Sequence, residues 1–190
     1  MAQGQPKVGA FTTRASRRVN VLVNEIGISE AHPLTTQVPQ PKIQKCRCIW
    51  DTGATNTVID KRIIDNLNLK PSGRRQVNTV GPSGAPNTYE VNTYLVNIYL
   101  PDNVVITGVS VSEGGLSNTE VLIGMDIIGM GDFGITNYDN KTTWSFRIPS
   151  IGEIDFIKGV KDHNWKFGLL SEEEKRRERN RRKREKKGRW

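Results

Sequence analysis

The chain has 190 residues, 35% of them hydrophobic, and a formal net charge of +8. This length suits one main domain, and the modest hydrophobic share indicates polar ends around a smaller core. No apolar run is long enough to span a bilayer, so no membrane partner is predicted. Most of the charge lies at the C-terminal end, where residues 171–190 contain 11 Lys and Arg against 5 Glu, a net charge of +6.

The N-terminal part is predicted to be a polar leader followed by two strands. Residues 1–18 contain three Arg, two Gly and one Pro but no acidic side chain, which predicts a flexible basic leader. The run 19–24 is a candidate strand. Three prolines within 32–41 indicate a loop, and a second strand is predicted over 42–50, ending at Asp51.

Both cysteines of the chain, Cys46 and Cys48, lie in this second strand. Residues two apart on a strand point to the same face, which is poor geometry for a disulfide between them. No further Cys and His residues complete a zinc site. We therefore expect reduced, half-buried thiols, no metal or other cofactor, and an intracellular, reducing (cytoplasmic) location.

The central part alternates short apolar runs with turns. The run 57–59 is followed by Asp60, which is a suitable N-cap for a helix over 61–67. Two strand-like runs, 76–80 and 88–100, flank a connection rich in Gly and Pro, which is typical of a hairpin.

The strand pattern continues through the rest of the body. A strand is predicted over 104–111, and a buried strand over 120–123 runs into Gly124 and about one helical turn. Residues 133–148 are predicted to form a hairpin that turns at 138–141. Many short strands with one or two short helices predict an all-β fold, either a closed β-barrel or a closed sandwich.

The C-terminal part differs in composition from the body. We assign 19–150 to the β domain, 151–170 to an extension without a clear pattern, and 171–190 to a basic helical tail. Ser171, with Glu three positions later, forms a capping box at the start of the tail. No apolar residue lies between 172 and 187, so this charged helix is predicted to be solvated, with nothing holding it to a core.

The candidate chemistry centres on Asp51, Thr52 and Gly53, which follow the strand at once. Burying an unpaired carboxylate is costly. Gly53 lets the backbone come close to a bound group, and the Thr52 hydroxyl can brace neighbouring backbone. Three-residue motifs of this kind also occur by chance, so an ordinary polar turn is the alternative on these residues alone.

Two later features favour a functional Asp51: a hairpin with small residues at its tip, and the element Leu122-Ile123-Gly124. In the order strand, Asp-Thr-Gly-Ala, short helix, hairpin and apolar-apolar-Gly, residues 42–130 resemble the retropepsin family. These are the single-domain aspartic proteases of retroviruses and their cellular and phage relatives. The continuation 121–128 resembles the non-viral branch, and the resemblance implies a closed β-barrel of the retropepsin type.

The resemblance also implies roles for individual residues. Asp51 would be the catalytic carboxylate of an aspartic endopeptidase, and Thr52 would brace the two active-site loops of a dimer against each other. Gly53 and Ala54 would lie beside the bound peptide backbone, and Gly124 would pack behind the Asp51 loop. The implied flap consists of Val80, Gly81, Pro82, Ser83, Gly84 and Ala85, and the implied substrate pocket of Thr55, Leu122, Ile123 and Gly124.

This chemistry requires a second chain. Hydrolysis by this route uses two carboxylates that share a proton, one acting as base on a water and the other as acid toward the scissile carbonyl. Two carboxylates about 3 Å apart cannot both ionise, so their pKa values separate. The sequence contains one Asp-Thr-Gly. We therefore predict a two-fold homodimer with the site on its axis, acting on protein or peptide substrates.

The sequence departs from the viral pattern at three positions. Thr55 and Met125 replace the Asp and the Arg that form an ion pair steadying the viral dimer. Trp50 is bulky for the position before the catalytic Asp, and we expect it to reshape the interface or narrow the cleft.

A binding module is the alternative to an enzyme: a retropepsin-like dimer that no longer cleaves and contacts nucleic acid or another polyanion weakly through residues 171–190. Clustered Lys and Arg neutralise phosphates and release counterions. No aromatic residues interleave them within 172–187 and no groove-reading motif is present, so such contact would be non-specific. A solvated charged helix explains the same residues equally well.

Overall fold

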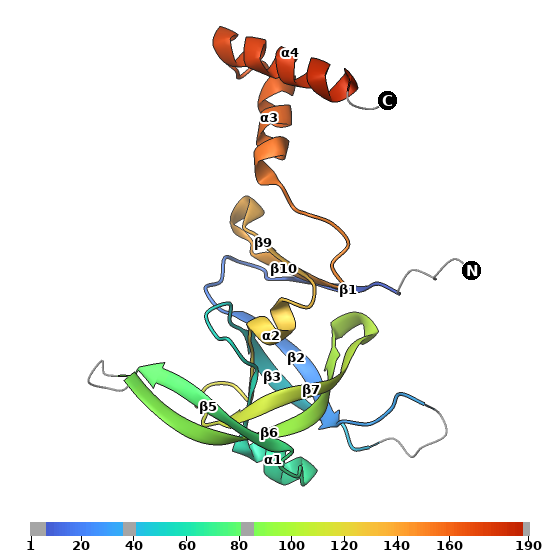
Figure 1. Cartoon of the computed structure of the whole chain (residues 1–190), viewed down its shortest axis with the longest axis vertical. Coiled ribbons are helices and arrows are strands. Elements are labelled where there is room, and N and C mark those ends of the chain that lie inside the picture. Colours follow the sequence, from blue (N-terminus) through green and yellow to red (C-terminus); the bar gives the residue numbers. More distant parts are fainter. Residues whose placement is uncertain (1–6, 36–40, 81–85, 188–190) are drawn as a thin grey trace. The chain divides into compact units, whose positions relative to one another are not determined.

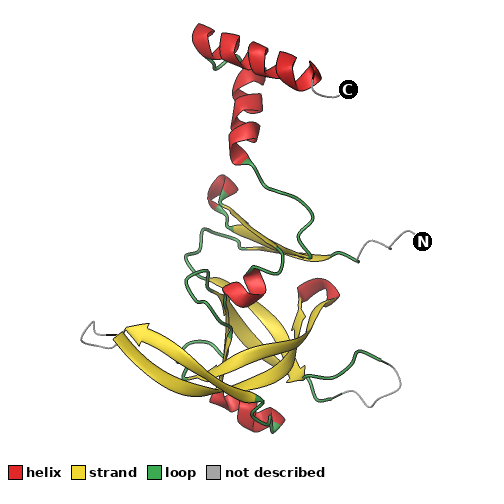
Figure 2. Cartoon of the chain, viewed as in Figure 1, coloured by secondary structure: helices red, strands yellow, loops and turns green. Residues whose placement is uncertain are grey.

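The computed structural model describes residues 7–35, 41–80 and 86–187 (Figure 1). The chain forms two compact units, Met1–Ile151 and Gly152–Trp190. The first unit is built almost entirely of strands and the second of two helices (Figure 2).

The larger sheet of the first unit closes into a barrel. Its strands pair in a ring, in the order β2 (Leu22–Glu30), β3 (Gln44–Trp50), β8 (Val121–Ile123), β4 (Val58–Asp60), β7 (Val104–Gly114) and β6 (Pro86–Leu100). The pairing of β6 with β2 completes the ring. A further strand, β5 (Gly73–Val80), pairs with β6 as a long hairpin. The fold is an all-β closed barrel, as the sequence predicted.

Two short helices accompany the barrel. Helix α1 (Lys61–Leu67) begins at the predicted N-cap, where the Asp60 side chain accepts a hydrogen bond from the Arg62 N–H. Helix α2 (Met125–Ile128) is the predicted single turn after Gly124. The 3₁₀ turns η1 (Pro101–Asn103) and η2 (Tyr138–Asn140) each connect two strands.

The register of β8 positions the candidate site. β8 runs parallel to β3, with Trp50 opposite Ile123, and antiparallel to β4, with Val58 opposite Leu122. The loop 51–57 joins β3 to β4, and these two strands are the neighbours of β8 on its two sides. The Asp51 loop and Gly124 are therefore brought to the same end of three neighbouring strands.

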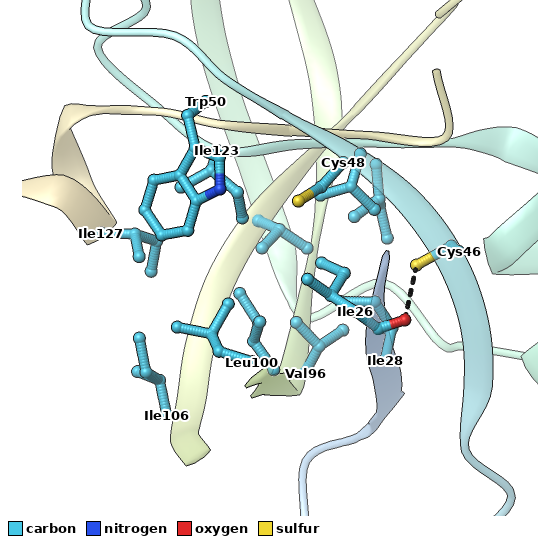
Figure 3. Close-up of a cluster of buried hydrophobic side chains, with 14 of the residues drawn as sticks. Ile26, Ile28, Cys46, Cys48, Trp50, Val96, Leu100, Ile106, Ile123 and Ile127 are labelled. Carbon is cyan, nitrogen blue, oxygen red and sulfur yellow. Dashed lines mark hydrogen bonds between the residues drawn. The ribbon is translucent and has the colours of Figure 1, made fainter. Parts of the chain in front are cut away.

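The barrel interior is packed with apolar side chains, including both thiols of β3 (Figure 3). Cys46 and Cys48 point to the same side, as predicted, and are free. They are 3% and 0% exposed, so the expectation of half-buried thiols is wrong. Burial raises the pKa of both thiols to about 12. No cluster of His, Cys, Asp and Glu suited to a metal ion occurs among the described residues.

A second, three-stranded sheet contains β1 (Gly9–Arg14), β10 (Thr143–Ile148) and β9 (Asp132–Thr136), in that order. The hairpin predicted within 133–148 is therefore confirmed. The flexible-leader prediction is wrong for residues 9–14, which pair with β10 from Gly9 opposite Ile148 to Arg14 opposite Thr143. Phe11 anchors this strand and is 2% exposed.

Trp50 links the two sheets and is 5% exposed. Its ring stacks on Phe133 at a centroid distance of 5.1 Å and contacts Phe146 and Phe11 at 5.4 and 5.7 Å. Whether Trp50 reshapes the interface or narrows the cleft stays a prediction. Its bulk fills the space between the barrel and the three-stranded sheet.

The second unit consists of α3 (Phe156–Lys166) and α4 (Glu172–Lys187). The predicted capping box is present, since Ser171 Oγ lies 2.7 Å from Glu174 Oε2 and 3.3 Å from the Glu174 amide nitrogen. The sequence predicted that nothing would hold α4 in place. Within this unit, however, Arg182 of α4 donates a hydrogen bond to Asp162 of α3. Among the described residues, no helix is both long and apolar enough to cross a membrane.

Candidate active site

The Asp51 carboxylate lies in a tight turn at the end of β3. The Asp51 N–H donates to the Ile123 carbonyl at 2.9 Å, which continues the β3–β8 pairing into the turn. Asp51 Oδ1 accepts a hydrogen bond of 2.8 Å from the Gly53 N–H, and the Asp51 carbonyl accepts one from the Ala54 N–H at 3.2 Å. The half-buried side chain is thus held in one orientation by its own turn.

The rest of this turn faces outward in the single chain. Thr52, Gly53 and Thr55 are exposed, and Ala54 is half-buried. Thr52 also borders a hollow of about 260 Å³ whose lining includes Trp50, Phe133 and Ile135. The surface around the Thr52 hydroxyl is therefore open.

The Leu122-Ile123-Gly124 element comes beside this loop as expected, but its members differ in exposure. Leu122 is half-buried, whereas Ile123 is 0% exposed and belongs to the core. The expectation that Ile123 lines a substrate pocket is therefore wrong for this chain. Its side chain supports the barrel beneath the site, because alternate residues of a strand point to opposite faces.

Gly124 packs directly behind the loop. A Cβ atom at this position would lie 2.6 Å from the Asn56 carbonyl carbon, 2.7 Å from its oxygen and 3.0 Å from the Ala54 oxygen. These neighbours are backbone atoms, which cannot rotate away. Glycine is therefore required by the close approach of two chain segments.

A set of hydrogen bonds joins the loop to α2. The Met125 N–H donates to the Ala54 carbonyl at 2.8 Å, and the Asp126 N–H donates to the Thr55 carbonyl at 3.2 Å. The Asp126 carboxylate accepts bonds from the Thr57 N–H (2.8 Å) and the Thr57 hydroxyl (2.7 Å). The Gly124 N–H donates to the same hydroxyl at 3.1 Å.

Thr57 and Asp126 are the site residues that sequence reasoning missed. They lie 69 positions apart in the sequence. The carboxylate of Asp126, two residues after Gly124, was the available signal in the sequence. Its partner could not be predicted, because it depends on the register of β4 and β8. In this chain the pair lies close to Thr55 and Met125, the positions at which the viral ion pair is absent.

The hairpin expected to cover the site is present up to its last described residues. β5 and β6 pair from Gly73 opposite Thr93 to Val80 opposite Pro86. Cross-strand contacts include the Arg74–Glu90 ion pair at 3.0 Å and a 2.8 Å hydrogen bond from Thr88 to Asn78. The other five residues assigned to the flap, Gly81, Pro82, Ser83, Gly84 and Ala85, lie outside the described residues.

Comparison with known protein families agrees with this arrangement. Residues 42–130 match the family of gag-polyprotein putative aspartyl proteases, and this match spans the Asp51 turn, the hairpin and the Gly124 element. The match makes this segment similar to the retropepsin-like aspartic proteases. Among curated proteins, none matches the sequence significantly.

Solved structures with a similar chain course include three aspartic protease domains. A retropepsin-like aspartic protease from Rickettsia conorii aligns with TM-score 0.43 and 13% identity over 75% of this chain and 96% of that one. EIAV protease in complex with the inhibitor HBY-793 aligns with TM-score 0.36 and 17% identity over 58% and 86%. The retroviral protease-like domain of Ddi1 from Leishmania major gives 0.36 and 13% over 73% and 99%.

Proposed function

We propose that this protein is a homodimeric aspartic endopeptidase in which each chain supplies one Asp51 carboxylate. The observation that carries the proposal is the Asp51 turn itself. A carboxylate at the end of a buried strand is held by the Gly53 N–H, and the segment behind it approaches so closely that only Gly124 fits. A carboxylate held in one orientation by its own turn is pre-organised for chemistry.

Two copies of this turn facing each other across a two-fold axis would complete the chemistry. One carboxylate takes a proton from a water, which attacks the scissile carbonyl, while the protonated partner donates to the carbonyl oxygen. A symmetric dimer is the simplest way to supply the second group.

The remaining site residues have supporting roles in this proposal. Thr52 is exposed, and in the dimer its hydroxyl would bond the partner's loop. The backbone groups of Gly53 and Ala54 would contact an extended peptide. Leu122 and Thr55 would contribute to the substrate pocket. The β5–β6 hairpin, with Val80 and the segment 81–85, would close over the bound chain as a flap.

The decisive experiment is cleavage of a peptide library by the wild-type protein and by Asp51→Asn. Asn keeps the size of the side chain but cannot act as acid or base, so activity should disappear. Asp139→Asn is the matched control, because Asp139 is exposed and lies in a turn far along the sequence. Sedimentation should show a dimer, and a statine-type transition-state analogue should inhibit. Equal activity of Asp51→Asn and wild type would end the proposal.

A dimer with no measurable cleavage and no binding of the analogue would favour the alternative, a silent retropepsin-like module.

We also propose that the protein works in a reducing intracellular compartment. The support is that Cys46 and Cys48 are both free and buried.

A further inference from the structure

The charged tail helix α4 has two different sides, and this division carries an inference beyond peptide hydrolysis. One side is turned toward α3. Glu178 is 6% exposed and accepts hydrogen bonds from Arg181 and Arg182. The bond from Arg181 is the main reason that the pKa of Glu178 falls to about 2.

Contacts with α3 extend this inner side. Arg182 donates to Asp162 at 2.6 Å, and its guanidinium lies 5.1 Å from the centre of the Trp165 ring. A planar guanidinium suits both contacts at once. Arg181 and Arg182 are therefore occupied within the unit.

The opposite side of α4 carries the exposed cations Arg176, Arg179 and Lys183, which we call the basic stripe. Their spacings of three and four residues place them along one side of a helix, turned away from Glu178. Within the described part of the chain, none of the three forms an ion pair, whereas Lys175 and Arg177 are paired with Glu172 and Glu173.

The dimensions of the basic stripe fit a phosphate backbone. With a rise of about 1.5 Å per residue, Arg176 and Lys183 lie roughly 10 Å apart along the helix axis. One strand of a duplex presents a phosphate about every 3.4 Å along its axis, so the stripe covers roughly three phosphates. Guanidinium groups also bond phosphate oxygens in a bidentate way.

We propose that the basic stripe of α4 binds the phosphodiester backbone of nucleic acid without sequence preference. Helix α4 contains no apolar residue, so it has nothing to insert into lipid and no aromatic ring to stack on bases. The interaction is therefore electrostatic. Neutralising about three phosphates releases counterions and makes binding weaken as salt rises.

The test compares the full-length protein with the variant Arg176→Gln/Arg179→Gln/Lys183→Gln. Binding of fluorescent duplex DNA and duplex RNA is measured by anisotropy between about 50 mM and about 200 mM salt, the range over which counterion release has a large effect. The variant should bind at least about tenfold more weakly at low salt, and the slope of log affinity against log salt should become shallower by about 2 to 3.

A matched control removes three positive charges elsewhere. Lys45, Lys70 and Lys141 are exposed residues of the first unit, so Lys45→Gln/Lys70→Gln/Lys141→Gln has the same net charge as the stripe variant. This control should bind nucleic acid almost as well as wild type. If the two variants lost the same amount of nucleic-acid affinity, net charge alone would explain the binding, and the proposal would be overturned.

Two further measurements keep the result specific. Arg176→Lys/Arg179→Lys keeps the charges and should retain most of the binding, and far-UV circular dichroism of all variants checks that the helices persist.

Vesicles of anionic lipid and polyglutamate serve as other polyanions, and tighter binding of the protein to either of them than to both duplexes would overturn the proposal. Peptide cleavage should be unchanged in the stripe variant, so failure here is distinguishable from failure of the protease proposal.

Discussion

The Asp126 carboxylate accepts both the backbone N–H and the hydroxyl of Thr57, at 2.8 and 2.7 Å. This pair fastens the loop that carries Asp51 to helix α2. The Thr57 hydroxyl also accepts the Gly124 N–H, so the loop, the β8 terminus and α2 share one hydrogen-bonded junction. The loop is therefore positioned from within the chain, without the viral Asp and Arg.

Replacing Asp126 with Ala should loosen this junction. Two donors of Thr57 lose their acceptor, and each unsatisfied buried donor costs about 1–3 kcal/mol. We expect unfolding to require about 2–4 kcal/mol less, and kcat to fall by more than about tenfold, because small misplacements of catalytic groups are costly. Urea unfolding and steady-state kinetics measure the two effects. Asp65→Ala, an exposed carboxylate on α1, is the control, and an equal effect there would contradict the role of the junction.

The second prediction concerns Gly124. In Gly124→Ala the new Cβ meets the Asn56 carbonyl at 2.6 and 2.7 Å, so the loop must move. Overpacking of this kind costs about 1–3 kcal/mol, and peptidase activity should fall with it. Gly115→Ala is the matched control, since nothing lies within 4 Å of its added Cβ. Thermal unfolding and peptide cleavage are the measurements, and a wild-type melting temperature in Gly124→Ala would show that the loop yields easily.

Much of the barrel could be predicted from local pattern alone. The runs around Val58 and Leu122 are short and apolar, Asp60 is a good N-cap, and the hairpin strands flank obvious turn residues. The order of these pieces was enough to place Asp51 in a turn after a strand. Each of these features depends on only a few residues that are neighbours in the sequence.

What could not be predicted depends on distant partners. Strand β1 has a weak pattern and exists because it pairs with β10, with Gly9 opposite Ile148. The burial of Trp50 follows from that same sheet, whose aromatic residues cover it. Helix α3 contains Gly159 and exposes Phe156 and Val160, so its pattern indicated no core-facing side.

The third prediction concerns Asn24, which joins the two sheets. Asn24 Oδ1 accepts the indole N–H groups of Trp50 and Trp144, each at 2.9 Å. In Asn24→Leu both buried donors lose their acceptor, so the free energy of unfolding should fall by about 2–5 kcal/mol. Asn66→Ala, at an exposed position, should change stability by less than about 0.5 kcal/mol. Chemical unfolding compares the two, and similar stability of both variants would exclude a structural role for the shared acceptor.

The last prediction is a loss of stability in alkali caused by the buried thiols. Burial raises the pKa of Cys46 and Cys48 from 9.0 to about 12, so the native state keeps both protonated while the unfolded chain ionises above 9.0. The contribution of the two thiols to the free energy of unfolding is therefore fully present below pH 9. It declines as the pH rises from 9 toward 12, because ionisation then favours the unfolded chain.

One pH unit corresponds to about 1.4 kcal/mol per group, so between pH 8 and pH 10 the free energy of unfolding should drop by roughly 2–3 kcal/mol more in wild type than in Cys46→Ala/Cys48→Ala. The variant starts from lower stability, because two core side chains are shortened, but its slope with pH should be shallower. Urea unfolding at several pH values measures both slopes. Parallel curves would mean that the thiols ionise equally in the native and unfolded states, which a barrel interior with 0% exposure at Cys48 does not permit.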